Sequence, residues 1–506
     1  MNATEMVSMV PASEESARSS RQDRETVVRK VVRGSVALGM RQVFVHGANI
    51  LGAVLLARIL SPLDFGVYAI VTFLVSFLGT FGGTGLAANL IRMHPAPTDH
   101  DYHSVFTFQQ LAVGALATVF WLCAPLGAAF YHLSPGASWV FRLAAASLVA
   151  TSWMVPAQVQ MERDLNFRKL ALIETTQAVL FNVVAVCMAW LGYGAISFGV
   201  ALCVRALTGA LMANWTEPCC YGWVWDWSTV KRHLRFGVLF QGAQILCLLK
   251  DSITPILVGF LVGTAGVGYI SWALMLSSYP VMTLMVLKRI YLPTFAHFQN
   301  DRGELATCFE RVIWLTTSVT APLAVALLLF VYPITDLVFG AKWESAIPLF
   351  YWFWAANAFV PTANPAVSLL NSLGHVRVPT MFALLWMAGT WTIGWPMTVS
   401  MGILGIAIAN CVVQFTNLFL FRIARKHVPF RIANAAFVPW LLAVGAGLPL
   451  LLCMRVAPIH TLFSLAVCIS AHLSLYLLLM FLVYRKRILR LVQVGLGGAT
   501  FAFRPW

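Results

Sequence analysis

A succession of apolar runs, each about 20 residues long, constrains this chain more than any other feature. As helices, runs of this length cross the roughly 30 Å hydrocarbon core of a bilayer, where a helix satisfies its own backbone groups. Only 10% of the 506 residues are charged, whereas a soluble domain carries about 25%. We therefore predict an all-α integral membrane protein. Breaking the runs at Pro, Gly and charge clusters gives about fourteen transmembrane spans: 35–60, 66–91, 105–131, 138–160, 169–191, 195–214, 236–261, 267–290, 312–334, 346–371, 379–400, 404–423, 433–454 and 461–484.

The distribution of cations supports this count. If the N-terminus is cytoplasmic, 27 of the 34 Lys and Arg residues lie on the cytoplasmic side, and only Lys342 and Arg455 lie on the other. Cytoplasmic loops are enriched in positive charge, so we expect both termini to be cytoplasmic. The net charge of +15 is explained by this topology, and we expect no nucleic-acid partner. The non-cytoplasmic loops are too short to form a domain that hosts chemistry.

A weak internal repeat suggests how the spans are grouped. LARILSPLDFGVYAI at 56–70 lies over VGFLVGTAGVGYIS at 258–271, with Leu60 over Leu261 and Tyr68 over Tyr269. Six predicted spans separate the two segments, which fits two pseudo-symmetric six-helix lobes. The predicted domains are a cytoplasmic N-terminal tail with an interfacial helix (1–34), an N-lobe (35–214), a cytoplasmic linker (215–235), a C-lobe (236–432), a C-terminal helix pair (433–484) and a basic cytoplasmic tail (485–506).

The joint between the first two spans is a tight hairpin. Ser61 can cap the second helix, Pro62 suits its first position, and the Asp64 carboxylate can reach back to the cap amide. Arg58 and Gly66 flank this joint and complete the structural hairpin motif.

Polar and small residues form a stripe along one face of the first span. The stripe faces protein or water, because exposing polar groups to lipid is costly. It serves either helix–helix hydrogen bonding or a substrate-lined cavity. Its members are Gln42, His46, Asn49 and Ala53.

Several motifs together resemble one family. LAR-x-LSP-x-DFG in the hairpin, MERDLNFRKLALIE, LRFGVLFQGAQI, GVGYISWALM, LPTFAHFQND and VFGAKWESAIPLF resemble the Wzx-like polysaccharide transporter branch of the MOP flippase superfamily, over roughly residues 35–425. The resemblance implies a bacterial inner-membrane protein with two lobes around a central cavity that opens alternately to each side. It implies an undecaprenyl-diphosphate-linked oligosaccharide as substrate, moved from the cytoplasmic to the periplasmic leaflet, and a polysaccharide polymerase or export machinery as partner.

Such a cargo needs a polar, cationic path at membrane depth. Arg205 and Lys250 lie near mid-span, and Arg41 lies nearer the cytoplasmic mouth. A charge there costs roughly 2.5–3.5 kcal/mol, so each cation either binds diphosphate or forms an intramembrane ion pair. The full set of candidate substrate-binding residues is Arg41, His46, Asn49, Arg205, Gln244 and Lys250.

Ion coupling has its own candidates. Pro255 cannot donate a hydrogen bond to the Asp251 carbonyl, so a kinked helix here could hold an ion or act as a gating hinge. Lys250 and Asp251 point about 100° apart on a helix, and we expect that they do not simply neutralise each other. Glu174 is a second acid within a span. We expect no cofactor and no metal site, with a proton or sodium gradient as a candidate energy source.

Other functions are also compatible with a membrane protein of this kind. A MOP-type antiporter or a peptidoglycan-precursor flippase has the same architecture with a different cargo. A membrane polymerase or ligase acting on lipid-linked glycans is the alternative from another class. Mid-span cations favour an anionic cargo, and the lack of a large predicted periplasmic loop disfavours an enzyme, so we expect a transporter.

Overall fold

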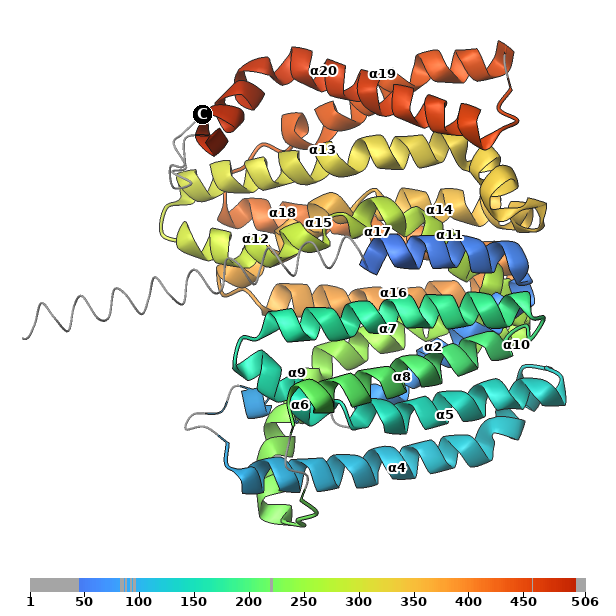
Figure 1. The fold of residues 1–506 in the computed structure, drawn as a ribbon. Helices are drawn as coiled ribbons and strands as arrows, with labels where there is room; N and C mark the ends of the chain where they lie inside the picture. The colour runs from blue at the N-terminus through green and yellow to red at the C-terminus, as the bar shows by residue number, and fades with distance from the viewer. Residues whose placement is uncertain are drawn as a thin grey trace, which may run out of the picture.

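The computed structural model describes residues 45–81, 86, 89–91, 93, 97–218, 222–456 and 458–496. In these ranges the regular structure is helical throughout, without a strand. Figure 1 shows the helices running side by side, with α19 and α20 beside α13 at one flank and α4 at the opposite flank. Eight described helices are long and apolar enough to cross a membrane, or nine if the bent pair α5 and α6 is one span. The whole predicted N-terminal tail (1–34) and Arg41 lie outside these ranges.

The first group of helices begins with Val45–Ile59 and a sharp turn. Thr98 and Asp101 then form a capping box at the start of α4, and α5 and α6 are bent by 42° just before Pro156. The bounds are α2 Pro62–Phe81, α4 Asp99–Phe130, η1 Pro135–Ala137, α5 Ser138–Ser152, α6 Val155–Arg163, α7 Phe167–Trp190 and α8 Ile196–Thr216.

The second group starts at Trp227, where Asp226 caps α9. Several predicted spans are divided here into two helices, as at Pro361 in the first turn of α15. The bounds are α9 Trp227–Asp251, η2 Thr254–Val258, α10 Gly259–Leu261, α11 Thr264–Met282, α12 Met285–His297, α13 Arg302–Ile334, η3 Thr335–Phe339, η4 Ala341–Ala346, α14 Ile347–Asn357, α15 Val360–Ser372, α16 Arg377–Met401, α17 Ile403–Gln414 and α18 Asn417–His427.

A C-terminal pair, α19 (Ala433–Val456) and α20 (Leu462–Leu496), packs against α13. The backbone leaves helical geometry at Tyr484, and α20 then continues into the predicted basic tail. In all fourteen predicted ranges the described residues are mostly helical. The number of membrane spans stays a prediction.

The order of neighbours in the first group recurs in the second. α5 packs against α2, α4 and α8, and α8 packs against α7. Six predicted spans later, α14 packs against α11, α13 and α17, and α17 packs against α16. Two related bundles would produce this pattern. The most extensive contact between the groups joins α2 to α11.

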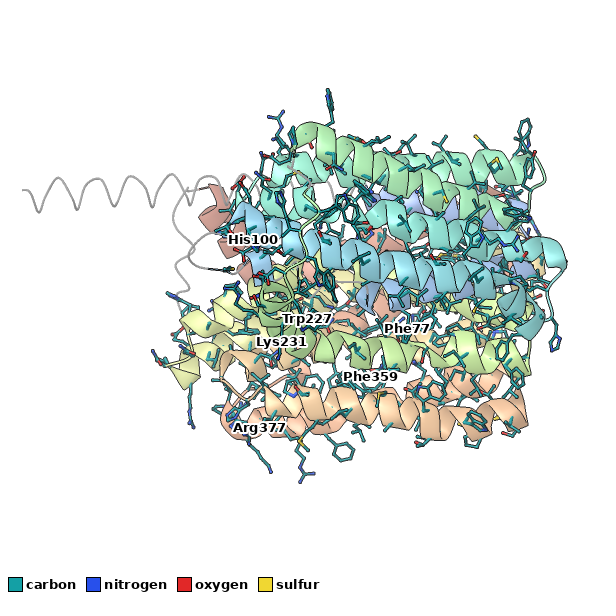
Figure 2. All side chains as sticks on the ribbon, turned by 90° about the horizontal axis from the view of Figure 1, so that it is seen from below. Phe77, His100, Trp227, Lys231, Phe359 and Arg377 are labelled. Carbon is teal, nitrogen blue, oxygen red and sulfur yellow. The ribbon has the colours of Figure 1, made fainter. Side chains whose placement is uncertain are left out.

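The bundle has two ends, which hold different turns and helix termini. The end that holds the turn between Val45–Ile59 and α2, which we call the hairpin end, also holds the turn between α13 and α14. The opposite end, which we call the basic end, holds the starts of α9, α13 and α16 and the end of α18. Figure 2 labels Lys231 and Arg377 toward this second end.

Candidate functional site

The hairpin joint has the capping geometry that its sequence predicts. The Asp64 carboxylate accepts hydrogen bonds from the Ser61 backbone amide at 3.0 Å and from its hydroxyl at 2.6 Å. The Asp64 amide in turn donates to the Ser61 hydroxyl at 3.2 Å. Both ends of the joint are therefore satisfied locally, and α2 starts in a fixed direction.

A latch from the second group holds the end of the first helix. The Lys342 ammonium donates to the backbone carbonyls of Arg58 at 2.9 Å and Leu60 at 2.7 Å. The buried Trp343 indole donates to the Ala57 carbonyl at 2.9 Å. The last carbonyls of a helix lack intrahelical donors, so these two side chains satisfy them across 282 to 286 residues of sequence.

The charge of the latch is only partly compensated. Partial burial lowers the pKa of Lys342, and the nearby Asp64 carboxylate opposes that shift. Arg58 itself is exposed, and it contributes a backbone carbonyl to the latch.

Two glycines allow α2 and α11 to cross in direct backbone contact. A Cβ on Gly66 would lie 1.7 Å from the Thr264 carbonyl oxygen, and a Cβ on Gly268 would lie 1.8 Å from the Pro62 carbonyl oxygen. The contact is reciprocal, because each glycine faces the residue four positions before the other. No larger side chain fits at either position.

The polar stripe of the first helix meets α7. The Asn182 side-chain amide donates to the Asn49 side-chain Oδ1 at 2.8 Å. Asn182 also lies over Gly52, where a Cβ would be 1.8 Å from the Asn182 Oδ1. Asn49 remains exposed, and His46 is half-buried and has a partner. Of the two alternatives for the polar stripe, helix–helix hydrogen bonding or a substrate-lined cavity, the structure shows a helix–helix hydrogen bond at Asn49.

Arg205 lies exposed on α8. Its guanidinium has no hydrogen bond or ion pair within the described part of the chain. The Gln177 amide donates to the Arg205 backbone carbonyl at 3.1 Å and ties this turn of α8 to α7. The side chain is thus available to an anion.

Lys250 and Asp251 correct an expectation. The Lys250 ammonium lies 2.6 Å from the Asp251 carboxylate, so the two neighbours do neutralise each other. The prediction was wrong because it compared Cβ directions only, whereas the four-carbon Lys stem is long enough to bring the ammonium to the neighbouring carboxylate. The Asp251 side chain is still 61% exposed and that of Lys250 is 28% exposed, so the pair is open to exchange.

The helix break beside this pair lies where Pro255 predicts it. α9 ends at Asp251, and the π-helical turn Thr254–Val258 contains the buried Pro255. Ser252 closes α9 by donating its amide to Leu248 at 2.9 Å. Gln244 lies on α9, but its side chain is outside what the structure describes. Glu174 is half-buried on α7 and has a partner.

The predicted cations do not meet. Arg205 and Lys250 stand on α8 and α9, which are not among the closely packed helix pairs, and no hydrogen bond or ion pair joins them in the described ranges. Sequence reasoning missed Asn182, which was visible as an amide within a span. It also missed the Lys342 latch, because no sequence pattern connects Lys342 to a helix end 282 residues away.

Residues 55–348 match the protein family described as "Polysaccharide biosynthesis protein". The chain is 25% identical over 341 residues to the succinoglycan biosynthesis transport protein ExoT of Rhizobium meliloti (strain 1021), covering 65% of this chain and 67% of that protein. It is 21% identical over 410 residues to the lipopolysaccharide biosynthesis protein WzxC of Escherichia coli (strain K12), covering 77% and 80%.

Solved structures share the fold. The lipid II flippase MurJ in its inward closed conformation superposes with a TM-score of 0.70 at 13% identity, covering 90% of this chain and 100% of that chain. An inward-facing multidrug resistance MATE family transporter of the MOP superfamily superposes with a TM-score of 0.59 at 14% identity, covering 78% and 98%. At these identities the likeness concerns the fold alone.

Proposed function

We propose that this chain, which belongs to the polysaccharide biosynthesis protein family, is an alternating-access flippase for a lipid-linked oligosaccharide. The proposed cargo is an undecaprenyl-diphosphate-linked repeat unit of an exported polysaccharide, carried from the cytoplasmic to the periplasmic leaflet. Relatives named for succinoglycan transport and lipopolysaccharide biosynthesis support a surface-polysaccharide cargo. The chain is thus a transporter and not an enzyme.

The observation that carries this proposal is the junction between the two helix groups at the hairpin end. Its tightest crossing joins backbone to backbone at Gly66 and Gly268, and the Lys342 latch binds carbonyls rather than acids. If the groups separate, the carbonyls and the ammonium can be hydrated, and no buried ion is left unpaired. Such a junction suits a gate that opens and closes repeatedly.

The cargo path in this proposal uses Arg205 and the Lys250–Asp251 pair. No residue in the described part of the chain pairs with the Arg205 guanidinium, which can therefore bind a phosphate oxygen. A diphosphate can also displace Asp251 from Lys250. The released Asp251 carboxylate would then accept a proton or a sodium ion, which couples cargo binding to a gradient. Glu174 is the second candidate for that role.

The test uses the gene's own host. We would delete the gene, keep the upstream glycosyltransferases, and measure the amount and leaflet of polyprenyl-diphosphate-linked oligosaccharide. Wild type, Arg205→Ala, Lys250→Ala and Asp251→Asn would be restored at matched levels. Arg168→Ala, which removes an exposed cation near the start of α7, is the control.

We expect complete units to accumulate on the cytoplasmic face of the deletion strain. Wild type and the control should clear them, whereas each cation variant should be roughly tenfold slower or worse, because a hydrogen bond to a charged group is lost. Asp251→Asn should weaken the dependence on the gradient. If complete units instead reach the periplasmic face and stay unpolymerised, the flippase proposal fails and a polymerase takes its place.

A further inference from the structure

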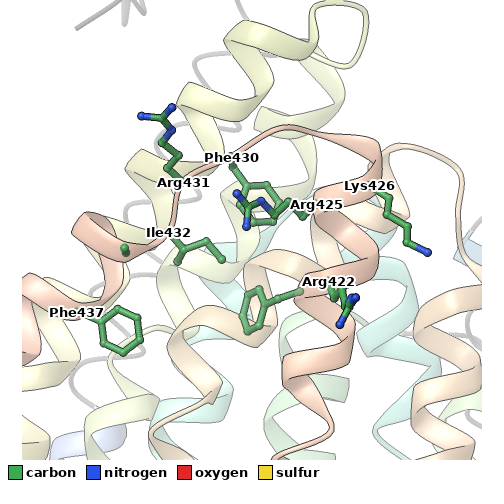
Figure 3. A pocket seen from close by; sticks show the side chains of 9 residues that line it. Arg422, Arg425, Lys426, Phe430, Arg431, Ile432 and Phe437 are labelled. Carbon is green, nitrogen blue, oxygen red and sulfur yellow. The ribbon is translucent and has the colours of Figure 1, made fainter.

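A pocket of about 850 Å³ opens at the basic end, between the end of α18 and the start of α19 (Figure 3). Four cations line it. Arg422, Arg425 and Lys426 come from one face of α18, at spacings of three and four residues, and Arg431 comes from the segment that leads to α19.

Packing fixes the walls of the pocket. The opposite face of α18 is anchored by the fully buried Leu420 and Ala424. The connecting segment is held by the buried Phe430 ring, whose centroid lies 4.6 Å from that of Phe309. The Arg431 backbone amide donates to the Glu310 carboxylate at 2.6 Å. The cations are therefore displayed by a rigid frame rather than by a loose tail.

No acidic side chain in the described ranges pairs with the four cations. All four are exposed, and within the described residues none of their side chains forms a hydrogen bond or an ion pair. Ala433, the first residue of α19, also lines the pocket, so the positive end of that helix adds to the field. Like charges gathered in one concavity repel each other, and an anionic ligand relieves that repulsion.

Apolar side chains continue from the pocket along the outer surface. Phe437, at the pocket, is 66% exposed, and Leu441, one turn further along α19, is 68% exposed. On α18, Phe419 is 63% exposed and Leu418 is 55% exposed. In a helix that crosses a bilayer these side chains face hydrocarbon. A ligand whose charged head fills the pocket therefore has its natural place for acyl chains beside Phe437.

We propose that this pocket binds the phosphate headgroup of an anionic phospholipid from the leaflet at the basic end. Arg422, Arg425, Lys426 and Arg431 bind the phosphate oxygens, and the acyl chains pack along α19. The ligand is a resident lipid and not the transported cargo, because the pocket lies on α18 and α19 rather than on α8 or α9, which carry Arg205 and Lys250.

The experiment measures lipid binding to the purified full-length chain. Native mass spectrometry would follow titration with cardiolipin, with phosphatidylglycerol and with phosphatidylcholine. The variants are Arg422→Gln/Arg425→Gln and, as an independent pair, Lys426→Gln/Arg431→Gln. Arg168→Gln/Lys231→Gln is the control. It also removes two exposed cations, one near the start of α7 and one near the start of α9, but neither lines the pocket. Size-exclusion profiles and thermal midpoints check that each variant folds.

We expect saturable binding of the two anionic lipids but not of phosphatidylcholine. Each cation near an anionic headgroup is worth about fivefold, so either pocket pair should weaken binding about 25-fold. The control pair should change it less than threefold. Equal losses in pocket and control variants would overturn the proposal, because they indicate a diffuse surface potential. Displacement of cardiolipin by equimolar polyprenyl diphosphate, lost in the pocket variants, would also overturn it and assign the pocket to the cargo.

Discussion

Replacing Gly66 by Ala should open the hairpin end. The added Cβ would lie 1.7 Å from the Thr264 carbonyl oxygen, whereas ordinary contact begins at 3.4 Å. The obstacle is backbone, which cannot rotate away as a side chain can. The two helices must therefore move apart by about 1.7 Å along this contact, or α2 must shift along its axis.

The size of the effect follows from two opposing terms. Forcing extra volume into a packed contact costs about 1–3 kcal/mol. Ala also stabilises a helix by about 0.5–1 kcal/mol relative to Gly, in both the closed and the open state, so that gain cancels in the equilibrium between them. A net bias of about 2 kcal/mol changes the ratio of open to closed molecules about 30-fold.

The assay measures a distance between the two groups. Spin labels at Leu63 and Leu261, which are 45% and 42% exposed at the hairpin end, would report it in a background without the ten native cysteines. We expect one short distance in wild type and a longer population in Gly66→Ala and in Gly268→Ala. Gly445→Ala is the control, because nothing lies within 4 Å of its Cβ. Unchanged distances in both crossing variants would refute the reasoning.

Three further predictions test the contacts around this junction. Lys342→Met should cost only about 1 kcal/mol, since the residue as a whole is exposed and its ammonium only partly buried. The substitution should lower the thermal midpoint and lengthen the label distance, with Glu344→Gln as the control. Asn182→Ala should cost about 1–2 kcal/mol, because the hydrogen bond between the buried Asn182 amide and the exposed Asn49 is lost, and an unchanged thermal midpoint would contradict this. Burial lowers the pKa of His233 below its ordinary 6.5 although Asp101 opposes the shift, so the folded state binds fewer protons and stability should fall as pH drops through about 6.5. The wild-type fall in midpoint between pH 8 and pH 5.5 should shrink in His233→Gln.

Local chemistry explains which features the sequence predicts well. The hairpin cap depends on Ser61 and Asp64, three residues apart, so the pattern carries the whole geometry. The break at Pro255 is equally local, because proline lacks the amide that the preceding turn needs. Apolar runs likewise place helices in all fourteen ranges, since helix formation in lipid follows from length and hydropathy.

Contacts between distant segments could not be predicted in the same way. Trp343 reaches a carbonyl 286 residues away, and nothing in either segment indicates the other. The Lys250–Asp251 pair failed for a different reason, since a helical wheel fixes Cβ directions but not the path of a long side chain. The basic pocket was missed because its cations, on α18 and at Arg431, come to line one pocket only after the chain turns between α18 and α19.

The two groups of helices are joined by different kinds of contact at the hairpin end and at the basic end. This difference determines which end responds to a change in pH. At the hairpin end the contacts are glycine backbone and lysine-to-carbonyl hydrogen bonds, which change little between pH 5 and pH 8. At the basic end Asp101 of α4 faces Arg232 at 3.5 Å and the buried His233 at 3.7 Å, both from α9. At both ends the contacts join the first group of helices to the second, but only the contacts at the basic end include a histidine. Protonation of His233 as the pH falls is therefore expected to act on the contacts at the basic end, and to leave the glycine and lysine contacts at the hairpin end unchanged.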